Sequence, residues 1–272
     1  MSGPIIATTD FEARADRAID RAIALGKQLD RQVVVFHARE VAPYASPKDH
    51  GLDEKMRGVL PAGAEDVQVA YAHGPVPPTI AEFADDSGAT LIAMGVARRN
   101  SIGDYFLGTC VDHVIRRTNV PVLVVKQRPR RPYRTIAVAT DFSAPSRAAV
   151  DWAAKLFPEA PIHLVHAFHV PYAAWNRADY VRTEIDTFAR EQMDTFIADL
   201  PDGTAERVTP HIVHGTVGSA VNGLIASEGI DLVVLGSHGE TGFRHATIGS
   251  QANALLGSVH ADAVIVGPRV SD

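Results

Sequence analysis

Apolar and polar positions follow two patterns along the chain, and together they predict alternating strands and helices. Short continuous apolar runs, such as residues 232–235, are typical of strands buried on both faces. Between these runs, apolar residues recur at helical spacing and share one face. In the second half four such helices are indicated, by Ala149, Trp152, Ala153 and Leu156; by Ile185, Ala189, Met193, Phe196 and Leu200; by Val221, Leu224 and Ile225; and by Leu255 with Leu256. Ser143 is a candidate N-cap for the first of them.

This alternation predicts an α/β fold. Parallel strands joined by right-handed helical crossovers form an open twisted sheet, Rossmann-like, with helices on both faces. Ligands of such sheets bind beyond the carboxyl ends of the strands, where the strand order reverses. We therefore look for functional residues directly after the buried strands.

The chain also repeats itself. Residues 4–11 resemble 135–142, and 34–38 resemble 163–167. The pairs 73–74 and 214–215, 90–95 and 231–236, 107–109 and 248–250, and 122–125 and 263–266 share one offset. A constant offset indicates a duplicated domain. We expect one domain over residues 1–127, a linker over 128–134 with two prolines nearby, and a second domain over 135–272.

Composition narrows the class of protein. The 272 residues are 46% hydrophobic and 21% charged, with a net charge of −6, which is ordinary for a globular protein and excludes intrinsic disorder. No apolar stretch approaches the length of a membrane span, and no secretory signal is visible, so we expect no membrane partner. Because the net charge is mildly negative, we also expect no nucleic-acid partner. A single cysteine, Cys110, fits a reducing cytoplasm.

One candidate binding motif follows the strand at 232–235. It reads Gly236-x-x-Gly239, nine residues, then Gly249-Ser250 at the start of a predicted helix. Glycines let backbone N–H groups approach a phosphate, and a helix N-terminus offers unpaired donors and the positive end of a dipole. The alternative is that Gly236 and Gly249 only make turns; we favour phosphate binding.

In its internal repeat and its glycine motif, the chain resembles a tandem member of the universal stress protein family. The nucleotide-binding branch of that family carries the same glycine pattern. The resemblance implies that Asp141 after Thr140 holds adenine, that Ala167 lines the pocket and that Leu235 and Gly236 lie by the ribose. It also implies a phosphate cradle of Gly239, Gly249, Ser250, Gln251 and Ala252.

The resemblance further implies two tandem five-stranded parallel sheets arranged as a pseudo-two-fold dimer. Strands 122–125 and 263–266 are apolar and end each copy, so each would be an exposed sheet edge unless it were paired. In the family, separate subunits dimerise through this strand. We expect the two copies to pair in the same way within one chain, and we leave further homodimerisation open.

The first copy departs from the pattern. Asp10, Gly95, Gly108 and Thr109 remain, but Arg98 stands where the second glycine should be. Its side chain either closes the site or offers charge-assisted contacts to an anion. We favour closure, and so expect a degenerate first site and an ATP site in the second copy alone.

Other candidate chemistry is weaker. A P-loop is absent, and Glu240 beside the glycine loop is more typical of a solvated residue than of one that orients water. The strand histidines 163 and 166, and likewise 211 and 214, should face opposite sides, so we predict no metal site. The equivalent repeat positions of His37 and His166 suggest a packing or pocket-lining role for both. Cys110 is interpreted as a small buried residue rather than a reactive thiol. A basic stretch is interpreted as a solvated linker; it comprises Lys126, Arg128, Arg130, Arg131 and Arg134.

The sequence thus predicts a cytoplasmic stress-response protein that binds ATP, with or without Mg²⁺, in its second domain. It would act as a sensor that meets an unidentified protein partner. Two alternatives stay open: a scaffold that binds another small ligand or a protein, and a slow ATPase.

Overall fold

The computed structural model describes residues 3–40, 51–98, 105–106, 109–168, 178–237 and 249–267. Strands and helices alternate through the first half, as the apolar pattern predicts. Its elements are β1 (Ile5–Thr8), α1 (Ala13–Leu29), β2 (Val33–Arg39), α2 (Leu52–Gly58), β3 (Gln68–His73), α3 (Val76–Asp86), β4 (Leu91–Gly95), β5 (Ala97–Arg98), β6 (Tyr105–Phe106), α4 (Thr109–Ile115) and β7 (Val122–Val125). Every residue of β1 and β7 is buried, which explains their continuous apolar sequences.

The second half repeats this order, with a 21-residue helix, α6, where the first half has the seven-residue α2. Its elements are β8 (Ile136–Ala139), α5 (Ala144–Leu156), β9 (Ile162–Phe168), α6 (Ala178–Ala198), α7 (Asp202–Ala205), β10 (Val208–His214), α8 (Val217–Ser227), β11 (Leu232–Gly236), α9 (Ser250–Ser258) and β12 (Asp262–Val266). The four helices indicated by the apolar pattern are α5, α6, α8 and α9, so that prediction is confirmed. Ser143 is the N-cap of α5 and accepts a hydrogen bond from the backbone N–H of Ser146, also as predicted.

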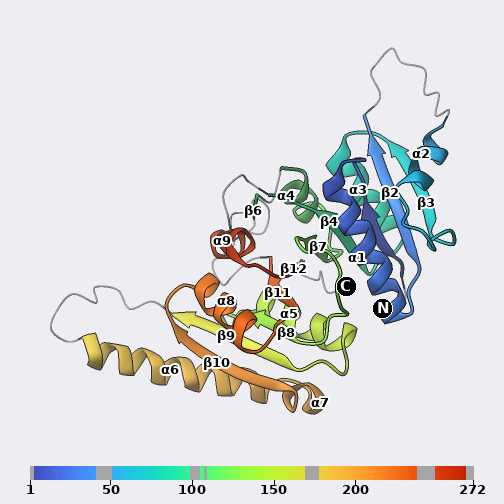
Figure 1. The fold of residues 1–272 in the computed structure, drawn as a ribbon. Coiled ribbons are helices and arrows are strands. Elements are labelled where there is room, and N and C mark those ends of the chain that lie inside the picture. The colour runs from blue at the N-terminus through green and yellow to red at the C-terminus, as the bar shows by residue number, and fades with distance from the viewer. Residues whose placement is uncertain are drawn as a thin grey trace.

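The described strands form one continuous ten-stranded sheet and a separate two-stranded hairpin, β5 with β6. The order of the large sheet is β10-β9-β8-β11-β12-β7-β4-β1-β2-β3, so both halves have the same internal order. Neighbours within each half are parallel, whereas β12 and β7 are antiparallel, with Val264 opposite Leu123. The predicted pairing of the two terminal strands is confirmed, and it merges the two expected sheets into one (Figure 1).

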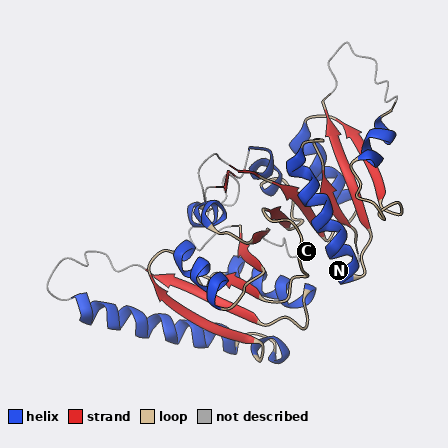
Figure 2. Ribbon diagram, in the orientation of Figure 1, coloured by secondary structure: helices blue, strands red, loops and turns tan. Residues whose placement is uncertain are grey.

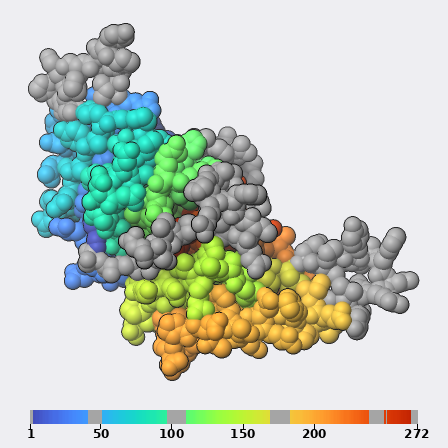
Figure 3. Space-filling view, turned by 180° about the vertical axis from the view of Figure 1, so that it is seen from behind, coloured from blue at the N-terminus to red at the C-terminus, as the bar shows by residue number. Residues whose placement is uncertain are grey.

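Helices cover both faces of this sheet (Figure 2). Each face has its own apolar core. One core takes buried side chains from α1, α2, α5 and α6, and the other takes them from α3, α4, α8 and α9. Both cores continue across the junction, because each contains residues of both halves. Seen from behind, the two halves lie side by side in direct contact (Figure 3).

The segment between the halves differs from the predicted solvated linker at two residues. Lys126 is only 1% exposed, and Tyr133 is also buried. Both contact Asp262, which begins β12: Lys126 through its backbone N–H, at 2.7 Å, and Tyr133 through its hydroxyl. The prediction was wrong here because the carboxylate that draws these residues inward lies in the other half of the chain. Four arginines of this segment are exposed, as predicted: Arg128, Arg130, Arg131 and Arg134.

Candidate functional site

The end of β8 holds the predicted adenine-contacting residues in a tight turn. Phe142 has φ 65°, a left-handed conformation unusual for a side chain of this size. The turn is stabilised by the hydroxyl of Thr140, which accepts a hydrogen bond from the N–H of Phe142 at 2.9 Å. Asp141 lies exposed between these two residues, and its carboxylate accepts hydrogen bonds from the N–H and hydroxyl of Ser143. The turn therefore presents a carboxylate of fixed orientation at the carboxyl edge of the sheet.

His166 ties the end of β9 to this turn. Its Nδ1 donates a hydrogen bond to the carbonyl oxygen of Thr140 at 2.9 Å, and its ring stacks on Phe142 with the centroids 4.4 Å apart. His37 makes the equivalent contacts in the first half, to the carbonyl of Thr9 and the ring of Phe11. The predicted packing role of the two histidines is confirmed. Ala167, the next residue on β9, is partly exposed beside the turn.

The end of β11 lies next to β8 in the sheet, which brings the second predicted segment to the same edge. Leu235 is buried and Gly236 is partly exposed. Beyond them, the carbonyl of Ser237 accepts a hydrogen bond from the N–H of Gly249 at 3.0 Å. This bond joins the strand end directly to the residue before α9, so Ser237 and Gly249 lie next to each other at the edge of the sheet.

Gly236 has a structural role that the motif did not reveal. A Cβ on this glycine would lie 2.8 Å from the backbone carbon and oxygen of Pro145 in the first turn of α5. Gly95 is in the same position against the backbone oxygen of Arg14 in the first half. The first half lacks the second glycine of the motif but keeps a glycine at the end of β4. Close packing of the helix against the strand end is therefore sufficient to explain the glycine at this position in both halves.

The first turn of α9 offers backbone donors at this edge. Gly249 is its N-cap and provides no side-chain cap, whereas α5 and α8 in the same half are capped by Ser143 and Thr216. The first N–H groups of a helix have no partner within the helix. The N–H groups of Ser250, Gln251 and Ala252 are of this kind, because the intrahelical ladder begins with the bond from Asn253 to the carbonyl of Gly249.

Several predicted residues lie outside the described residues. These are Gly239 and Glu240 of the second-half loop, Gly108 of the first half, and the side chains of Arg98, Thr109 and Ser250. The backbone of Arg98 is described: it pairs with Tyr105 in the hairpin of β5 and β6. Closure of the first site by the Arg98 side chain therefore stays a prediction.

The first half has a different feature that sequence reasoning missed. The Nε of Arg14 donates a hydrogen bond to Oδ2 of Asp10 at 2.8 Å, so the equivalent of Asp141 is held in an ion pair. Alignment of the repeats places Pro145 where Arg14 stands, and proline cannot make this pair. The spacing of Asp10 and Arg14, four residues apart at a helix start, was the available signal.

Cys110 and the histidines complete the candidate chemistry. Burial, and then the charge of Asp10, raise the pKa of the Cys110 thiol, which favours the interpretation as a small inert residue. His163 and His211 lie on the same face of neighbouring strands, with Nδ1 and Nε2 2.9 Å apart, a pairing that the sequence did not predict. Among the described residues, no three metal-ligating side chains lie close enough together to hold a metal.

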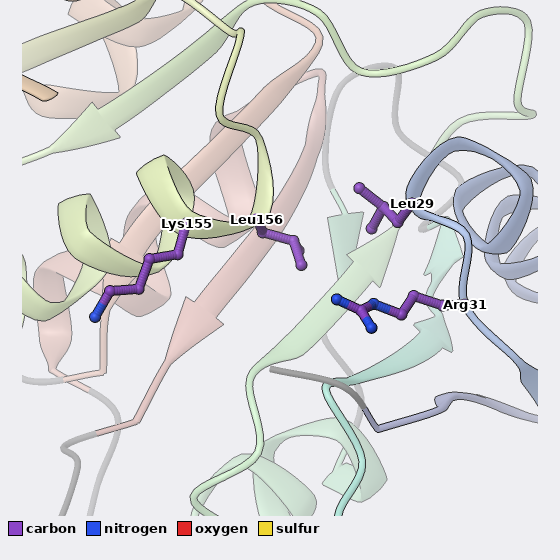
Figure 4. A pocket seen from close by; sticks show the side chains of 4 residues that line it. All are labelled: Leu29, Arg31, Lys155 and Leu156. Atoms are coloured by element: carbon purple, nitrogen blue, oxygen red, sulfur yellow. The ribbon is translucent and has the colours of Figure 1, made fainter. Parts of the chain in front are cut away.

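A hollow of about 280 Å³ lies away from this edge, at the junction of the halves. It is lined by Leu29 and Arg31 from the first half and by Lys155 and Leu156 from the second. Arg31 and Leu156 point toward one another, whereas the Lys155 amine points away (Figure 4). These residues end or follow α1 or end α5, so they lie at the opposite end of the strands from Asp141. No helix in the described part of the chain has the length and apolar character needed to cross a membrane.

Two parallel sheets of identical strand order, joined edge to edge by their last strands, define a tandem α/β protein with duplicated domains. Comparison with known families agrees: the profile of the Universal stress protein family matches residues 1–126 and again residues 132–267. The chain belongs to the universal stress protein family. A universal stress protein of Methanocaldococcus jannaschii is 25% identical over 138 residues, which cover 45% of this chain and 81% of that protein.

Solved structures show the same tandem fold. A universal stress protein from Archaeoglobus fulgidus has a TM-score of 0.64 at 16% identity, with 98% of this chain and 99% of that chain covered. A putative universal stress protein from Pseudomonas aeruginosa has a TM-score of 0.65 at 19% identity, with 98% and 94% covered. At these identities the likeness concerns the fold alone.

Proposed function

We propose that this protein binds ATP in its second half, at the carboxyl edge of β8, β9 and β11, and acts as a nucleotide-dependent regulator. The observation that carries the proposal is the start of α9. It begins at a glycine without a side-chain cap, beside the end of β11, with three backbone donors in its first turn. The positive end of a helix dipole with free N–H groups suits a phosphate chain.

The neighbouring turn suits the other end of the nucleotide. The exposed carboxylate of Asp141 accepts hydrogen bonds, and the exocyclic amine of adenine donates them. Ala167 leaves space beside this carboxylate because its side chain is a single methyl group. Thr140 orients Asp141 through the turn, and Leu235 provides apolar surface between the base and the phosphates.

The two halves would then have different roles. In the first half, Arg14 already occupies the carboxylate of Asp10 and would compete with a base for it. We therefore assign the ATP site to the second half and a partner-domain role to the first. A partner protein would recognise the nucleotide-bound face of the second half. Hydrolysis forms no part of the proposal.

The test replaces a motif glycine by the residue found in the degenerate copy. Gly239→Arg should abolish ATP binding, measured by titration calorimetry, because a long side chain would crowd the phosphates. Gly203→Arg is the matched control: it adds the same charge in α7, where a side chain would meet nothing within 4 Å. Circular dichroism and the unfolding midpoint should be unchanged in both variants.

Unchanged ATP affinity in Gly239→Arg would contradict the assignment of the site. Absence of ATP binding by the unmodified protein would favour the scaffold alternative, in which the pocket holds another ligand. Mass spectrometry of the protein as purified distinguishes these cases, since it identifies any adenine nucleotide that is retained.

A further inference from the structure

A buried polar cluster joins the two halves at their junction. Asp262 is 1% exposed, and its carboxylate contacts the Nε of Arg21 at 3.1 Å and the hydroxyl of Tyr133. The same carboxylate accepts backbone hydrogen bonds from Lys126 at 2.7 Å and Gln127 at 2.9 Å. Four groups of the first half and of the connecting segment thus converge on one side chain of the second half.

Lys126 extends this cluster to α9. Its Nζ donates hydrogen bonds to the carbonyl oxygens of Leu256, at 2.6 Å, and Val259, at 2.8 Å. These carbonyls belong to the last turn of α9 and the residue that caps it. Carbonyls at a helix C-terminus have no partner within the helix and carry its negative partial charge, so an ammonium group there is well placed to hold the helix end.

The pseudo-two-fold axis makes this contact one-sided. Around the central pair of Leu123 and Val264, the position equivalent to Lys126 is Gly267. A Cβ on Gly267 would lie 3.6 Å from the carbonyl oxygen of Thr118, which follows α4, but glycine has no side chain to reach it. By the same equivalence Pro121 replaces Asp262. Only α9 is therefore held by a side chain of this kind from the opposite half, among the described residues.

The side chain of Lys126 changes between a charged ammonium and a neutral amine near neutral pH. Burial lowers the pKa of its ammonium to about 7, and the negative charge of Asp262 opposes this shift without overcoming it. In the described part of the chain, the neighbouring charged or titratable groups include Arg21 and Arg17 of α1 and the hydroxyl of Tyr133. Arg17 contacts the carbonyl of Lys126, and Arg21 shares the Asp262 carboxylate.

We propose that Lys126 is a positioning residue for the phosphate-binding end of α9, through which the first half sets nucleotide affinity in the second half in a proton-dependent way. This inference rests on the proposed function, because the N-terminus of α9 is the proposed phosphate site. The charged ammonium holds the C-terminal carbonyls and fixes the helix. The neutral amine holds them more weakly, so the first-turn N–H groups of the same helix are less well ordered for phosphate.

The test uses the full-length protein in four forms. Lys126→Met removes the charge and keeps the length of the side chain, and Lys126→Arg keeps a charge at every pH used. Lys155→Met is the matched control, since Lys155 is exposed on α5. Hydrogen exchange of residues 250–258, corrected for the intrinsic pH dependence of exchange, and ATP affinity are both measured at pH 6.0 and pH 8.5.

In the unmodified protein and in Lys155→Met, we expect α9 protection to fall and the ATP Kd to rise about threefold between pH 6.0 and 8.5, the size of a charge at a helix terminus. Lys126→Met should show the lower α9 protection and the weaker ATP affinity at both pH values. Lys126→Arg should keep the higher protection and the tighter affinity at both. An equal pH dependence of α9 protection in the unmodified protein and Lys126→Met would overturn the inference. If no form binds ATP, the proposed function fails, while the exchange data still decide the role of Lys126.

Discussion

At the scale of single residues, the second half has polar side chains at two positions where the first half has apolar ones. His163 and His211 form a stacked, partly buried pair beneath α8, with ring centroids 5.1 Å apart. The repeat places Val34 and Ala70 at the same positions of the first half. Burial, and then the proximity of His163, lower the pKa of His211.

The histidine pair predicts acid sensitivity. Because the pKa of His211 is lower in the folded protein than the ordinary 6.5, the unfolded chain binds the proton more readily, and stability is lost as the pH falls below about 6.5. We expect the double variant His163→Val, His211→Ala to lose less stability between pH 7.5 and 5.5 than the unmodified protein, measured by urea denaturation. His260→Gln, at an exposed histidine, should not alter this slope; an identical slope in all three would contradict the assignment.

The residues that sequence reasoning missed share one property: their partners lie far away in the chain. From the sequence, Lys126 is interpreted as part of a solvated basic stretch, because its partner Asp262 lies 136 residues away in the chain. His163 and His211 were each judged on their own strand, and only the parallel register of β9 and β10 brings them together. Periodicity reports the neighbours of a residue along the chain, whereas these contacts depend on the assembled sheet.

At the scale of elements, the apolar pattern predicted the helices of the second half correctly, because burial of one helix face has a local signature. The β5–β6 hairpin was not predicted, since strands of two residues leave no periodicity. For the glycines at strand ends, the sequence suggested a ligand-binding role but not a packing role. Gly236 was attributed to ligand binding, but its immediate cause is the backbone of α5 against the end of β11.

This packing role predicts a stability difference between two glycines. Gly236→Ala should destabilise the protein by about 2 kcal/mol, because its Cβ would meet the backbone of Pro145 and force overpacking. Gly223→Ala, in α8 with open space around it, should instead stabilise by about 0.5–1 kcal/mol through helix propensity. Urea denaturation measures both, and a neutral Gly236→Ala would show that the strand end tolerates a side chain.

At the scale of the whole molecule, the two halves share one sheet. The apolar strands β7 and β12 would each be an edge, and their antiparallel pairing removes both edges within one chain. Sequence reasoning predicted this pairing from the repeat and the family resemblance. It did not foresee that the junction contains a buried ionic cluster on one side only, since the repeat suggests symmetry.

Continuity of the sheet and of both cores predicts cooperative unfolding. Each core contains buried residues of the two halves, so neither half can open without exposing apolar surface of the other. We expect the amides of β1 and β8 to exchange with the same free energy under native conditions, measured by hydrogen exchange at increasing urea. A half that exchanges at clearly lower urea than the other would show that the junction is too weak to couple them.

We propose that the two halves of one fold have unequal roles, one binding ATP and the other supporting it. Calorimetric titration of the full chain with ATP tests this directly through the stoichiometry. We expect one site per chain, because Arg14 engages Asp10 in the first half while α9 begins without a side-chain cap in the second. Two equal sites per chain, or none, would contradict it.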